Sequence, residues 1–407
     1  MHVVVVGAGQ AAAQAIETLR RRNFTGPITL IGDEPILPYQ RPPLSKKLLS
    51  GELERDRLLI RHARYYEEHG ITQLLGRRVV SIDCSARTVR CDDDTLVSYD
   101  ALLLATGSRP RRIAVPGGDL AGVCYLRTES DALALRDELK PGRRLVVVGG
   151  GYIGLEVAAT SRERGVEVTV LEMADRVMNR VTCSKLSAFL AQEHERHGVR
   201  IHCQARVNAI LADAQSRSVR AVRCDDGTEH PADLVLIGVG VEPVDELAKA
   251  AGLDCSNGIV VDASCRTSDP YIFSAGDCTN HPSLRYGGRV RLESVDNAFE
   301  QGTTAALSIL GEHAQHSKTP WFWSDQYDLK LVIVGLCSGH DAVVVRGDPH
   351  SRAFSLCYLR DGELIAIDTV NSPKDQMAAR KLIAARARPD PNKLADVTTP
   401  LKDSVTL

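Results

Sequence analysis

Two stretches of the chain place closely spaced glycines directly after a run of valines. They read HVVVVGAGQAAA over residues 2–13 and RRLVVVGGGYIGLEVAA over residues 143–159. In the second stretch, Gly149 allows a tight turn, Gly151 lets the backbone approach a ligand, and Gly154 lets a helix pack on the preceding strand. A loop of this kind binds the pyrophosphate of a dinucleotide, because the free N–H groups and the dipole of the helix N-terminus favour an anion.

An acidic residue follows the second loop at the distance expected for ribose recognition. The strand VEVTVLE ends at Glu172, whose carboxylate can accept hydrogen bonds from the ribose hydroxyls. Met173 and Ala174 come next, so no cation adjoins Glu172 to hold a 2′-phosphate. The loop is therefore predicted to bind NADH in preference to NADPH, with Arg176 as the one nearby residue that could change this preference.

The first loop repeats the arrangement with alanine in the last position. Gly7, Gly9 and Ala12 take the three spaced positions. The unit closes at the strand ITLIGDE, where the carboxylate of Asp33, or alternatively that of Glu34, would reach a ribose. The first loop is therefore predicted to bind a second dinucleotide.

Each loop requires a strand before it and a helix after it. Around the second loop, the sequence predicts a strand over 144–148 and a helix that runs to about Arg164 and is stopped by Gly165. Two dinucleotide sites in one chain indicate that one cofactor passes electrons to the other, since nicotinamide donates a hydride and a flavin can accept it. One loop is therefore predicted to hold FAD and the other NADH.

The composition is that of an ordinary globular protein. The chain has 407 residues, of which 43% are hydrophobic, and a formal net charge of −2. This length favours two or three domains, and this charge gives no indication of nucleic-acid binding. No apolar stretch approaches the ~20 residues of a membrane span. A strand is expected from His2, with no charged leader or cleavage site, which predicts a cytoplasmic protein that binds no membrane.

The cysteines and histidines are not spaced as metal ligands or as a redox pair. None of the eleven cysteines forms a C-x-x-C or C-x-x-x-x-C motif, which predicts no metal centre and no local redox disulfide. Their odd number, with no signal peptide, predicts reduced thiols. His194 and His197 lie one helical turn apart in HERH, and His313 and His316 repeat that spacing. Because the neighbouring residues are charged, we expect both pairs to lie on exposed helix faces.

Two further glycine turns complete a set of motifs. SYDALLLATGSRP, over residues 98–110, contains Ala105–Thr106–Gly107, and RTSDPYIFSAGDC, over 266–278, contains Gly276–Asp277. With the paired loops, these motifs resemble the FAD/NAD(P)H flavoprotein reductases of the glutathione-reductase fold over the whole chain. The resemblance implies an α/β fold with two Rossmann-like dinucleotide-binding domains and a C-terminal α+β interface domain. The implied boundaries are 1–110 and 242–316 for the FAD domain, 111–241 for the NAD domain and 317–407 for the interface domain.

One segment separates the branches of this family. Residues 37–51, LPYQRPPLSKKLLSG, contain no cysteine, whereas the disulfide reductases of the fold carry a C-x-x-x-x-C pair there. RPPLSK resembles the ferredoxin reductase branch, the putidaredoxin reductase-like enzymes, as do YLRT at 125–128, RLESVDNAFEQ at 291–301 and PWFWSDQYDLK at 320–330. This branch implies hydride transfer from NADH to tightly bound, non-covalent FAD. Single electrons would then pass to a 2Fe–2S ferredoxin that feeds a cytochrome P-450 or Rieske oxygenase.

Two other functions on this scaffold remain open. One is an NADH oxidase or monodehydroascorbate reductase-like enzyme, although an oxidase of the thiol type would need a cysteine within residues 37–51. The other is a redox interaction protein similar to apoptosis-inducing factor, although the chain shows neither a targeting leader nor a long basic insertion.

The resemblance also implies roles for individual residues. Lys46 would lie beside the flavin and pair with Glu156 of the NAD helix, so that both border the nicotinamide pocket, or the pair is an ordinary interdomain salt bridge. Trp323 would cover the flavin edge where electrons leave, or it packs in a core. The Val295 N–H, at the start of a helix from about Ser294, would face the flavin pyrimidine. The other positions implied to bind FAD are Gly7, Gly9, Ala11, Ala12, Asp33, Arg41, Lys46, Val79, Ala105, Thr106, Gly107, Arg127, Gly276 and Asp277, and those implied to bind NAD are Gly149, Gly151, Gly154 and Glu172.

The last 90 residues or so have a different pattern. LKLVIVGL, AVVVRG, AFSLCYL and ELIAID predict strands, with Asp361–Gly362 as a hairpin turn. Ser372–Pro373 is predicted to open a helix that runs to about Ala387.

The implied partner predicts a charged docking surface. Because ferredoxins of these systems are generally acidic, we expect a basic rim formed by Arg285, Arg289, Arg291 and Lys330.

Overall fold

The computed structural model describes residues 1–215 and 217–405. These residues form two compact units. The first comprises Met1–Gln40, Arg55–Arg109 and Val241–Lys318, and the second comprises Arg41–Glu54 and the described residues of 110–240 and 319–405. The division into three domains predicted from the sequence remains a prediction.

A five-stranded parallel sheet forms the centre of the first unit, in the order β19-β7-β1-β2-β3. Its middle strand β1 is a run of four fully buried valines, as expected for a parallel strand covered on both faces. The sheet consists of β1 (Val3–Val6), β2 (Ile28–Gly32), β3 (Ile71–Leu75), β7 (Ala101–Leu104) and β19 (Ile272–Ser274).

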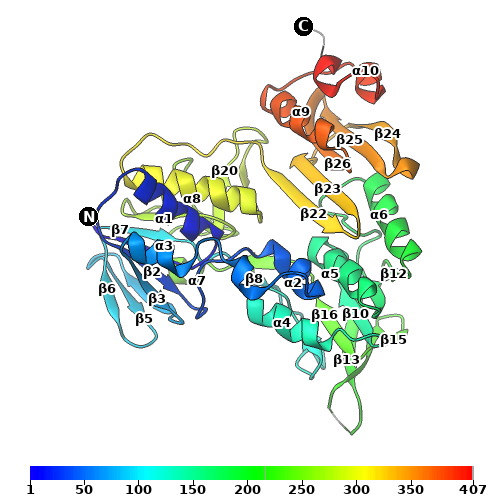
Figure 1. Cartoon of the computed structure of the whole chain (residues 1–407), viewed down its shortest axis with the longest axis horizontal. Coiled ribbons are helices and arrows are strands. Elements are labelled where there is room, and N and C mark those ends of the chain that lie inside the picture. Colours follow the sequence, from blue (N-terminus) through cyan, green and yellow to red (C-terminus); the bar gives the residue numbers. More distant parts are fainter. Residues whose placement is uncertain (216, 406–407) are drawn as a thin grey trace. The chain divides into compact units, whose positions relative to one another are not determined.

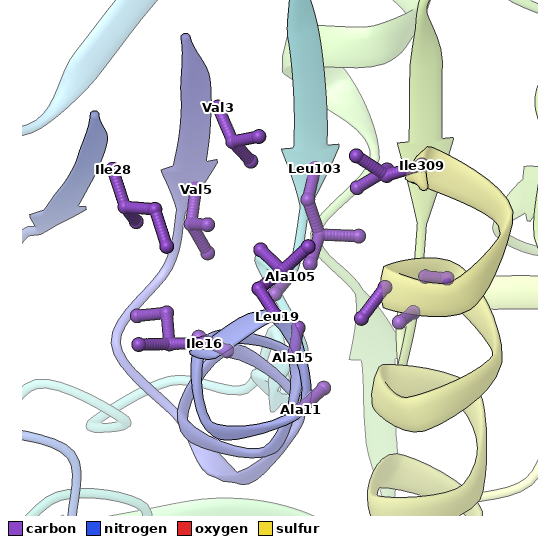
Figure 2. Packing of buried hydrophobic residues seen from close by; sticks show 14 of the residues in the cluster. Val3, Val5, Ala11, Ala15, Ile16, Leu19, Ile28, Leu103, Ala105 and Ile309 are labelled. Carbon is purple, nitrogen blue, oxygen red and sulfur yellow. The ribbon is translucent and has the colours of Figure 1, made fainter. Parts of the chain in front are cut away.

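Helix α1 (Gln10–Arg21) packs against this sheet and lies alongside helix α8 (Val295–Ile309), which also contacts the edge strand β19 (Figure 1). Ala11, Ala15 and Ile16 of α1 meet Val5 and Leu103 of the sheet in one apolar cluster (Figure 2). The two helices approach closely at Gly302, where a Cβ atom would lie 2.5 Å from the Ala11 carbonyl oxygen.

Smaller elements complete the first unit. An antiparallel sheet contains β4 (Val79–Asp83), β5 (Thr88–Cys91) and β6 (Leu96–Ser98), and another sheet contains β18 (Ile259–Val260), β20 (Thr279–Pro282) and β21 (Arg289–Val290). Strands β8 (Ser108–Pro110) and β17 (Val241–Pro243) pair with each other. The remaining helices are the 3₁₀-helix η2 (Arg55–Leu58), α3 (Ala63–Glu68) and α7 (Glu246–Ala250).

The second unit contains another five-stranded parallel sheet, in the order β12-β11-β10-β16-β9. Helix α5 (Tyr152–Glu163) follows β10 and ends before Gly165, whose φ of +80° confirms the predicted glycine stop. The strands are β9 (Val123–Cys124), β10 (Arg144–Val148), β11 (Glu167–Leu171), β12 (Arg200–His202) and β16 (Leu234–Ile237). The other elements around this sheet are η1 (Pro42–Ser45), α2 (Lys47–Ser50), α4 (Glu129–Glu138), α6 (Ser184–Arg196), β13 (Val207–Ala212), β14 (Val219–Cys224) and β15 (Glu229–Pro231).

The C-terminal part of the second unit is an antiparallel sheet in the order β22-β23-β26-β25-β24. Asp361 and Gly362, at φ values of +49° and +77°, connect β25 to β26 and confirm the predicted hairpin. Helix α9 begins at Pro373 as predicted but ends at Ala384, one turn early. The elements are β22 (Trp321–Gln326), β23 (Leu329–Gly335), β24 (Ala342–Asp348), η3 (Pro349–Ser351), β25 (Ala353–Arg360), β26 (Glu363–Val370), α9 (Pro373–Ala384), α10 (Pro391–Ala395) and η4 (Leu401–Ser404). The predicted architecture of two Rossmann-like sheets and a C-terminal α+β part is confirmed.

Candidate dinucleotide sites and a buried ion pair

The second glycine loop is shaped for a close ligand. Gly149 has a φ of +108°, and a Cβ there would lie 2.4 Å from the Gly238 carbonyl oxygen. A Cβ on Gly154 would lie 2.1 Å from the Gly149 carbonyl oxygen, so these two positions accept only glycine. At Gly151, which caps α5, a Cβ would meet no described atom within 4 Å, and this open space lies where the helix N–H groups point.

Glu172 is fixed beside this loop by two backbone hydrogen bonds. The Gly150 N–H donates to its Oε2 at 2.7 Å, and the Ala174 N–H donates to its Oε1 at 2.7 Å. Gly150 and Glu172 line a cavity of about 440 Å³, whose lining also includes Met173, Arg180 and Arg206. A carboxylate held in this way retains acceptor capacity toward the cavity, which suits a ribose diol and repels a phosphate.

Arg176 does not line this cavity. Its Nη2 donates to the Asn179 carbonyl oxygen at 3.1 Å, in the loop after β11. The cations at the cavity are Arg180 and Arg206, and Arg206 lies 3.9 Å from the Asp225 carboxylate. The residue that the sequence singled out as a possible 2′-phosphate ligand is therefore engaged elsewhere.

The first glycine loop repeats this backbone. Gly7 has a φ of +105°, and a Cβ there would lie 2.1 Å from the Ala105 carbonyl oxygen. A Cβ on Gly9 would meet no described atom within 4 Å, and Ala12 is fully buried behind it. Gly276 approaches Ala11, since a Cβ on Gly276 would lie 3.3 Å from the Ala11 Cβ. The predicted positions of this loop are thus brought together in the first unit.

The acidic candidates of the first unit have different surroundings. Asp33 is exposed, whereas the Glu34 carboxylate accepts a hydrogen bond from the Tyr39 hydroxyl at 2.7 Å. This arrangement favours Asp33 over Glu34 as the group available to a ligand. Asp277 accepts a hydrogen bond from the Ser108 hydroxyl at 2.8 Å.

The turn after β7 and the start of α8 complete the site around the first glycine loop, which we call the first cradle. The site around the second glycine loop is the second cradle. Thr106 donates through its hydroxyl to the Val244 carbonyl oxygen at 2.6 Å, and Gly107 has a φ of +69°. Ser294 caps α8 by accepting from the Asn297 N–H at 3.1 Å. Val295 is the first residue of that helix, so its N–H has no acceptor within the helix. Val79 is buried at the start of β4.

The predicted ion pair between Lys46 and Glu156 is present within the second unit. Lys46 Nζ lies 2.7 Å from Glu156 Oε2, and the Glu156 residue is only 2% exposed. Two prolines begin the 3₁₀-helix η1, which places Ser45 and Lys46 at its end. The Ser45 hydroxyl donates to the same Oε2 at 2.5 Å, and the Ser324 hydroxyl donates to Oε1 at 2.7 Å. Both carboxylate oxygens are thus hydrogen-bonded, which a buried charge requires.

Other predicted residues of the second unit lie in two small groups. Arg41 Nη1 donates to the Arg127 carbonyl oxygen at 2.6 Å, so these two arginines are neighbours. Trp323 is half-buried, with its ring centroid 5.3 Å from that of Trp321, and the Arg380 guanidinium lies 4.2 Å from the Trp321 centroid. The roles predicted for these residues toward a flavin remain predictions.

Both cradles fit dinucleotides. Each combines a glycine that tolerates no side chain at the turn with a second glycine that faces open space at a helix N-terminus. No group of three or more His, Cys, Asp or Glu side chains in residues 1–215 and 217–405 is arranged to hold a metal ion.

Comparison with known proteins assigns the family. A model of the pyridine nucleotide-disulphide oxidoreductase family matches residues 1–302, and a reductase C-terminal model matches residues 321–405. The chain belongs to the pyridine nucleotide-disulphide oxidoreductase family. This confirms the predicted oxidoreductase class and the predicted FAD and nicotinamide cofactors.

Relatives in this family cover nearly the whole chain. Rhodocoxin reductase of Rhodococcus erythropolis is 44% identical over 99% of this chain and 94% of its own length. The ferredoxin–NAD(+) reductase component of the anthranilate 1,2-dioxygenase system of Burkholderia cepacia is 45% identical over 98% of each chain. The reductase in a covalent putidaredoxin reductase–putidaredoxin complex has a TM-score of 0.96 at 41% identity, covering 98% of this chain and 97% of that one. The predicted membership of the putidaredoxin reductase-like branch is confirmed.

Two expectations about histidines are wrong. His194 is fully buried, although its charged neighbours indicated an exposed helix face. His316 lies after the end of α8 rather than in a helix, and its ring packs edge-on against His281, with centroids 4.8 Å apart. Charged neighbours in sequence therefore did not identify the buried face of α6.

Two arginines of the predicted basic rim make contacts within the fold. Arg289 Nη2 donates to the Val261 carbonyl oxygen at 2.5 Å and also to that of Asn280. The Arg291 side chain is 10% exposed, and its guanidinium lies 2.7 Å from Glu293. Lys330 is exposed on β23. Arg289 and Arg291 therefore have structural partners that the sequence did not indicate.

Sequence reasoning missed the polar residues that surround Glu156. Ser45 adjoins Lys46 in RPPLSK, and Ser324 adjoins Trp323 in PWFWSDQ, yet neither serine was singled out. A usable signal was the alternation of Ser324 and Gln326 along β22, which places both polar side chains on one face of the strand.

Proposed function

We propose that the protein is an NADH-dependent ferredoxin reductase that supplies single electrons to a 2Fe–2S ferredoxin of a cytochrome P-450 or Rieske oxygenase system. Its FAD would accept a hydride from NADH and release electrons one at a time. The carrying observation is that the chain has two dinucleotide cradles but no cysteine in residues 37–51 that could relay electrons as a disulfide.

The names of the relatives support a ferredoxin as the electron acceptor. One relative is named as a reductase of rhodocoxin, and another as the ferredoxin–NAD(+) reductase component of an anthranilate 1,2-dioxygenase system. The matched structure is a complex of a reductase with putidaredoxin. For the described residues, no helix is both long and apolar enough to cross a bilayer. We place the protein in the cytoplasm, with no membrane or nucleic acid as a partner.

The residues of this chain have distinct parts in the proposal. Glu172, fixed by Gly150 and Ala174, holds the ribose of NADH, and the α5 N-terminus holds the pyrophosphate. The Lys46–Glu156 pair borders the nicotinamide, and Trp323 borders the point of electron exit. No side chain needs to act as an acid, a base or a nucleophile, so the protein contributes alignment and electrostatics.

The test is turnover of the purified holoenzyme with NADH, a 2Fe–2S ferredoxin and cytochrome c as the final acceptor. We expect reduction that depends on the ferredoxin and slows as salt rises from about 50 to 500 mM, since salt screens charges over ~8–10 Å. The control omits the ferredoxin and follows NADH loss and oxygen uptake. Equal NADH consumption with and without ferredoxin would instead favour the oxidase.

A further inference from the structure

A continuous line of buried hydrogen bonds begins at the Glu156 carboxylate. Ser324 Oγ lies 2.7 Å from Glu156 Oε1, and Gln326 Nε2 lies 3.1 Å from Ser324 Oγ. His194 Nε2 lies 2.9 Å from Gln326 Oε1, and the Tyr327 hydroxyl lies 3.1 Å from His194 Nδ1. Ser324 and His194 are fully buried, and Gln326 is 2% exposed.

The chemistry of these groups fixes the direction of every hydrogen bond. A carboxylate only accepts, so Ser324 gives it its single proton and must then accept from the Gln326 amide nitrogen. The Gln326 oxygen consequently faces His194, which must carry its proton on Nε2. His194 Nδ1 then accepts from Tyr327. With His194 neutral and protonated on Nε2, all four donors point toward Glu156.

The line joins three separate parts of the second unit. Glu156 lies on α5, which follows the second glycine loop, whereas Ser324 and Gln326 lie on β22 of the C-terminal sheet and His194 lies on α6. Lys46 and Ser45 contact the other oxygen of Glu156. The carboxylate is therefore held from both sides, and its orientation depends on the C-terminal sheet as well as on the segment that carries Lys46.

We propose that Ser324, Gln326 and His194 are positioning residues that hold the Glu156–Lys46 pair in the one orientation that aligns NADH for hydride transfer. This rests on the proposed function, in which that pair borders the nicotinamide. The three residues act through Glu156 and touch no substrate. The C-terminal sheet thereby supports the NADH half-reaction in addition to its proposed part in electron exit.

The principal test compares two buried serines of the C-terminal sheet. Ser324→Ala removes the hydrogen bond to Glu156, and Ser355→Ala, the matched control, removes a 2.8 Å hydrogen bond from a fully buried serine to Asp375. A hydrogen bond to a charged group strongly stabilises the orientation of that group. Its loss in Ser324→Ala should therefore slow NADH-driven flavin reduction, measured by stopped flow, by about 10- to 100-fold. We expect Ser355→Ala to lower the melting temperature similarly and to leave that rate within about 2-fold.

A second measurement requires no turnover. The holoenzyme is treated with acetic anhydride, and acetylation of Lys46 is followed by mass spectrometry, because a loosened Glu156 leaves the amine more reactive. We expect acetylation of Lys46 to be several-fold faster in Ser324→Ala than in the protein without substitutions or in Ser355→Ala. This result separates the two proposals, because it stands even if NADH fails to reduce the flavin, which would contradict the proposed function.

A conservative pair at the far end completes the test. His194→Gln keeps a donor that can reach Gln326, whereas His194→Asn is too short to do so. We expect the Gln variant to stay within about 3-fold of the parent rate and the Asn variant to fall about 10-fold. Equal rates of flavin reduction in Ser324→Ala and Ser355→Ala, with unchanged labelling of Lys46, would overturn the proposal. If the rate of flavin reduction and the melting temperature fell equally in both His194 variants, His194 would be excluded from the set of positioning residues.

Discussion

In the first unit Val6 pairs with Ile31, and in the second unit Val148 pairs with Leu171. Ile31 is followed by Gly32, and Leu171 is followed by Glu172. The first unit therefore has a glycine at the position where the second unit has the Glu172 carboxylate. The reason lies in the loop. A Cβ on Gly32 would lie 2.6 Å from the Cβ of Ala8, whereas the equivalent loop residue Gly150 has no side chain.

In each cradle, therefore, only one of these two facing positions carries a side chain: the loop position in the first and the strand end in the second. Where the loop carries Ala8, the strand must end in glycine, and the acidic residue moves one position on, to the exposed Asp33. Where the loop carries Gly150, the absence of a Cβ leaves room for the Glu172 side chain, whose carboxylate accepts a hydrogen bond from the Gly150 N–H. The second cradle holds a preorganised acceptor, which suits a cofactor that must be recognised at every turnover, whereas the first relies on its backbone.

The largest effects are expected from the turn glycines. Gly149→Ala combines backbone strain with a contact 2.4 Å from Gly238, and should weaken NADH binding by about 100-fold or more while FAD is retained. Gly7→Ala should instead yield protein depleted of FAD. Calorimetry with NADH and the visible spectrum distinguish the two. The control is Gly227→Ala, which has a φ of +85° and no described neighbour within 4 Å of its Cβ. Loss of FAD in Gly149→Ala would contradict the separation of the cradles.

Cofactor preference should change only in the second cradle. The protein is expected to prefer NADH over NADPH by about 10- to 200-fold in kcat/KM, because the fixed Glu172 carboxylate repels a 2′-phosphate. Glu172→Arg should narrow or invert this ratio. Gly150→Ala should also narrow the NADH/NADPH ratio, because the new Cβ would lie 3.2 Å from Glu172 Oε2 and displace the carboxylate. The change should be smaller than in Glu172→Arg, because the negative charge remains. Asp33→Asn is the matched control, and a change in its NADH/NADPH ratio would be inconsistent with the assignment.

Each unit contains a buried histidine that should make it sensitive to acid. Burial lowers the pKa of His194 from 6.5 to about 4, and burial together with His316 lowers that of His281 to about 3. Below pH 6.5 the unfolded chain gains a proton that the native protein does not, so stability is full above that pH and is lost as the pH falls toward 4. His194→Gln should have a flatter dependence of melting temperature on pH over this range. An unchanged slope would show that His194 is not responsible.

The smallest effects are expected at the cysteines. Each of the eleven is a free thiol in the described part of the chain, and burial raises the pKa of Cys278, next to Asp277 in the first cradle. Single Cys→Ser variants should keep NADH–ferricyanide turnover within a few-fold, because neither cradle uses a thiol. A loss beyond about 100-fold in any FAD-retaining variant would reveal a redox cysteine.

Local patterns predicted the elements and the backbone of the sites. The valine runs, the glycines at 149 and 165, and the turn at Asp361–Gly362 each depend on nearby residues, and each has the expected geometry. The Lys46–Glu156 pair could be predicted only from the family resemblance, because its members lie in distant segments. The burial of His194 could not be predicted from the sequence. It depends on contacts with Gln326, at the end of β22, and with Tyr327, which lie more than 100 residues further along the chain.

The close approach of α8 to α1 at Gly302 also bears on the order of assembly during synthesis. The first sheet contains β1 at the start of the chain, yet its edge strand β19 ends at Ser274 and its covering helix α8 ends at Ile309. Until those residues leave the ribosome, β7 has an unpaired edge and α1 lacks its partner. The parallel sheet of the second unit is complete by Ile237, so it can form first. A nascent chain therefore exposes an open β-edge to other chains until residues 272–309 have been synthesised.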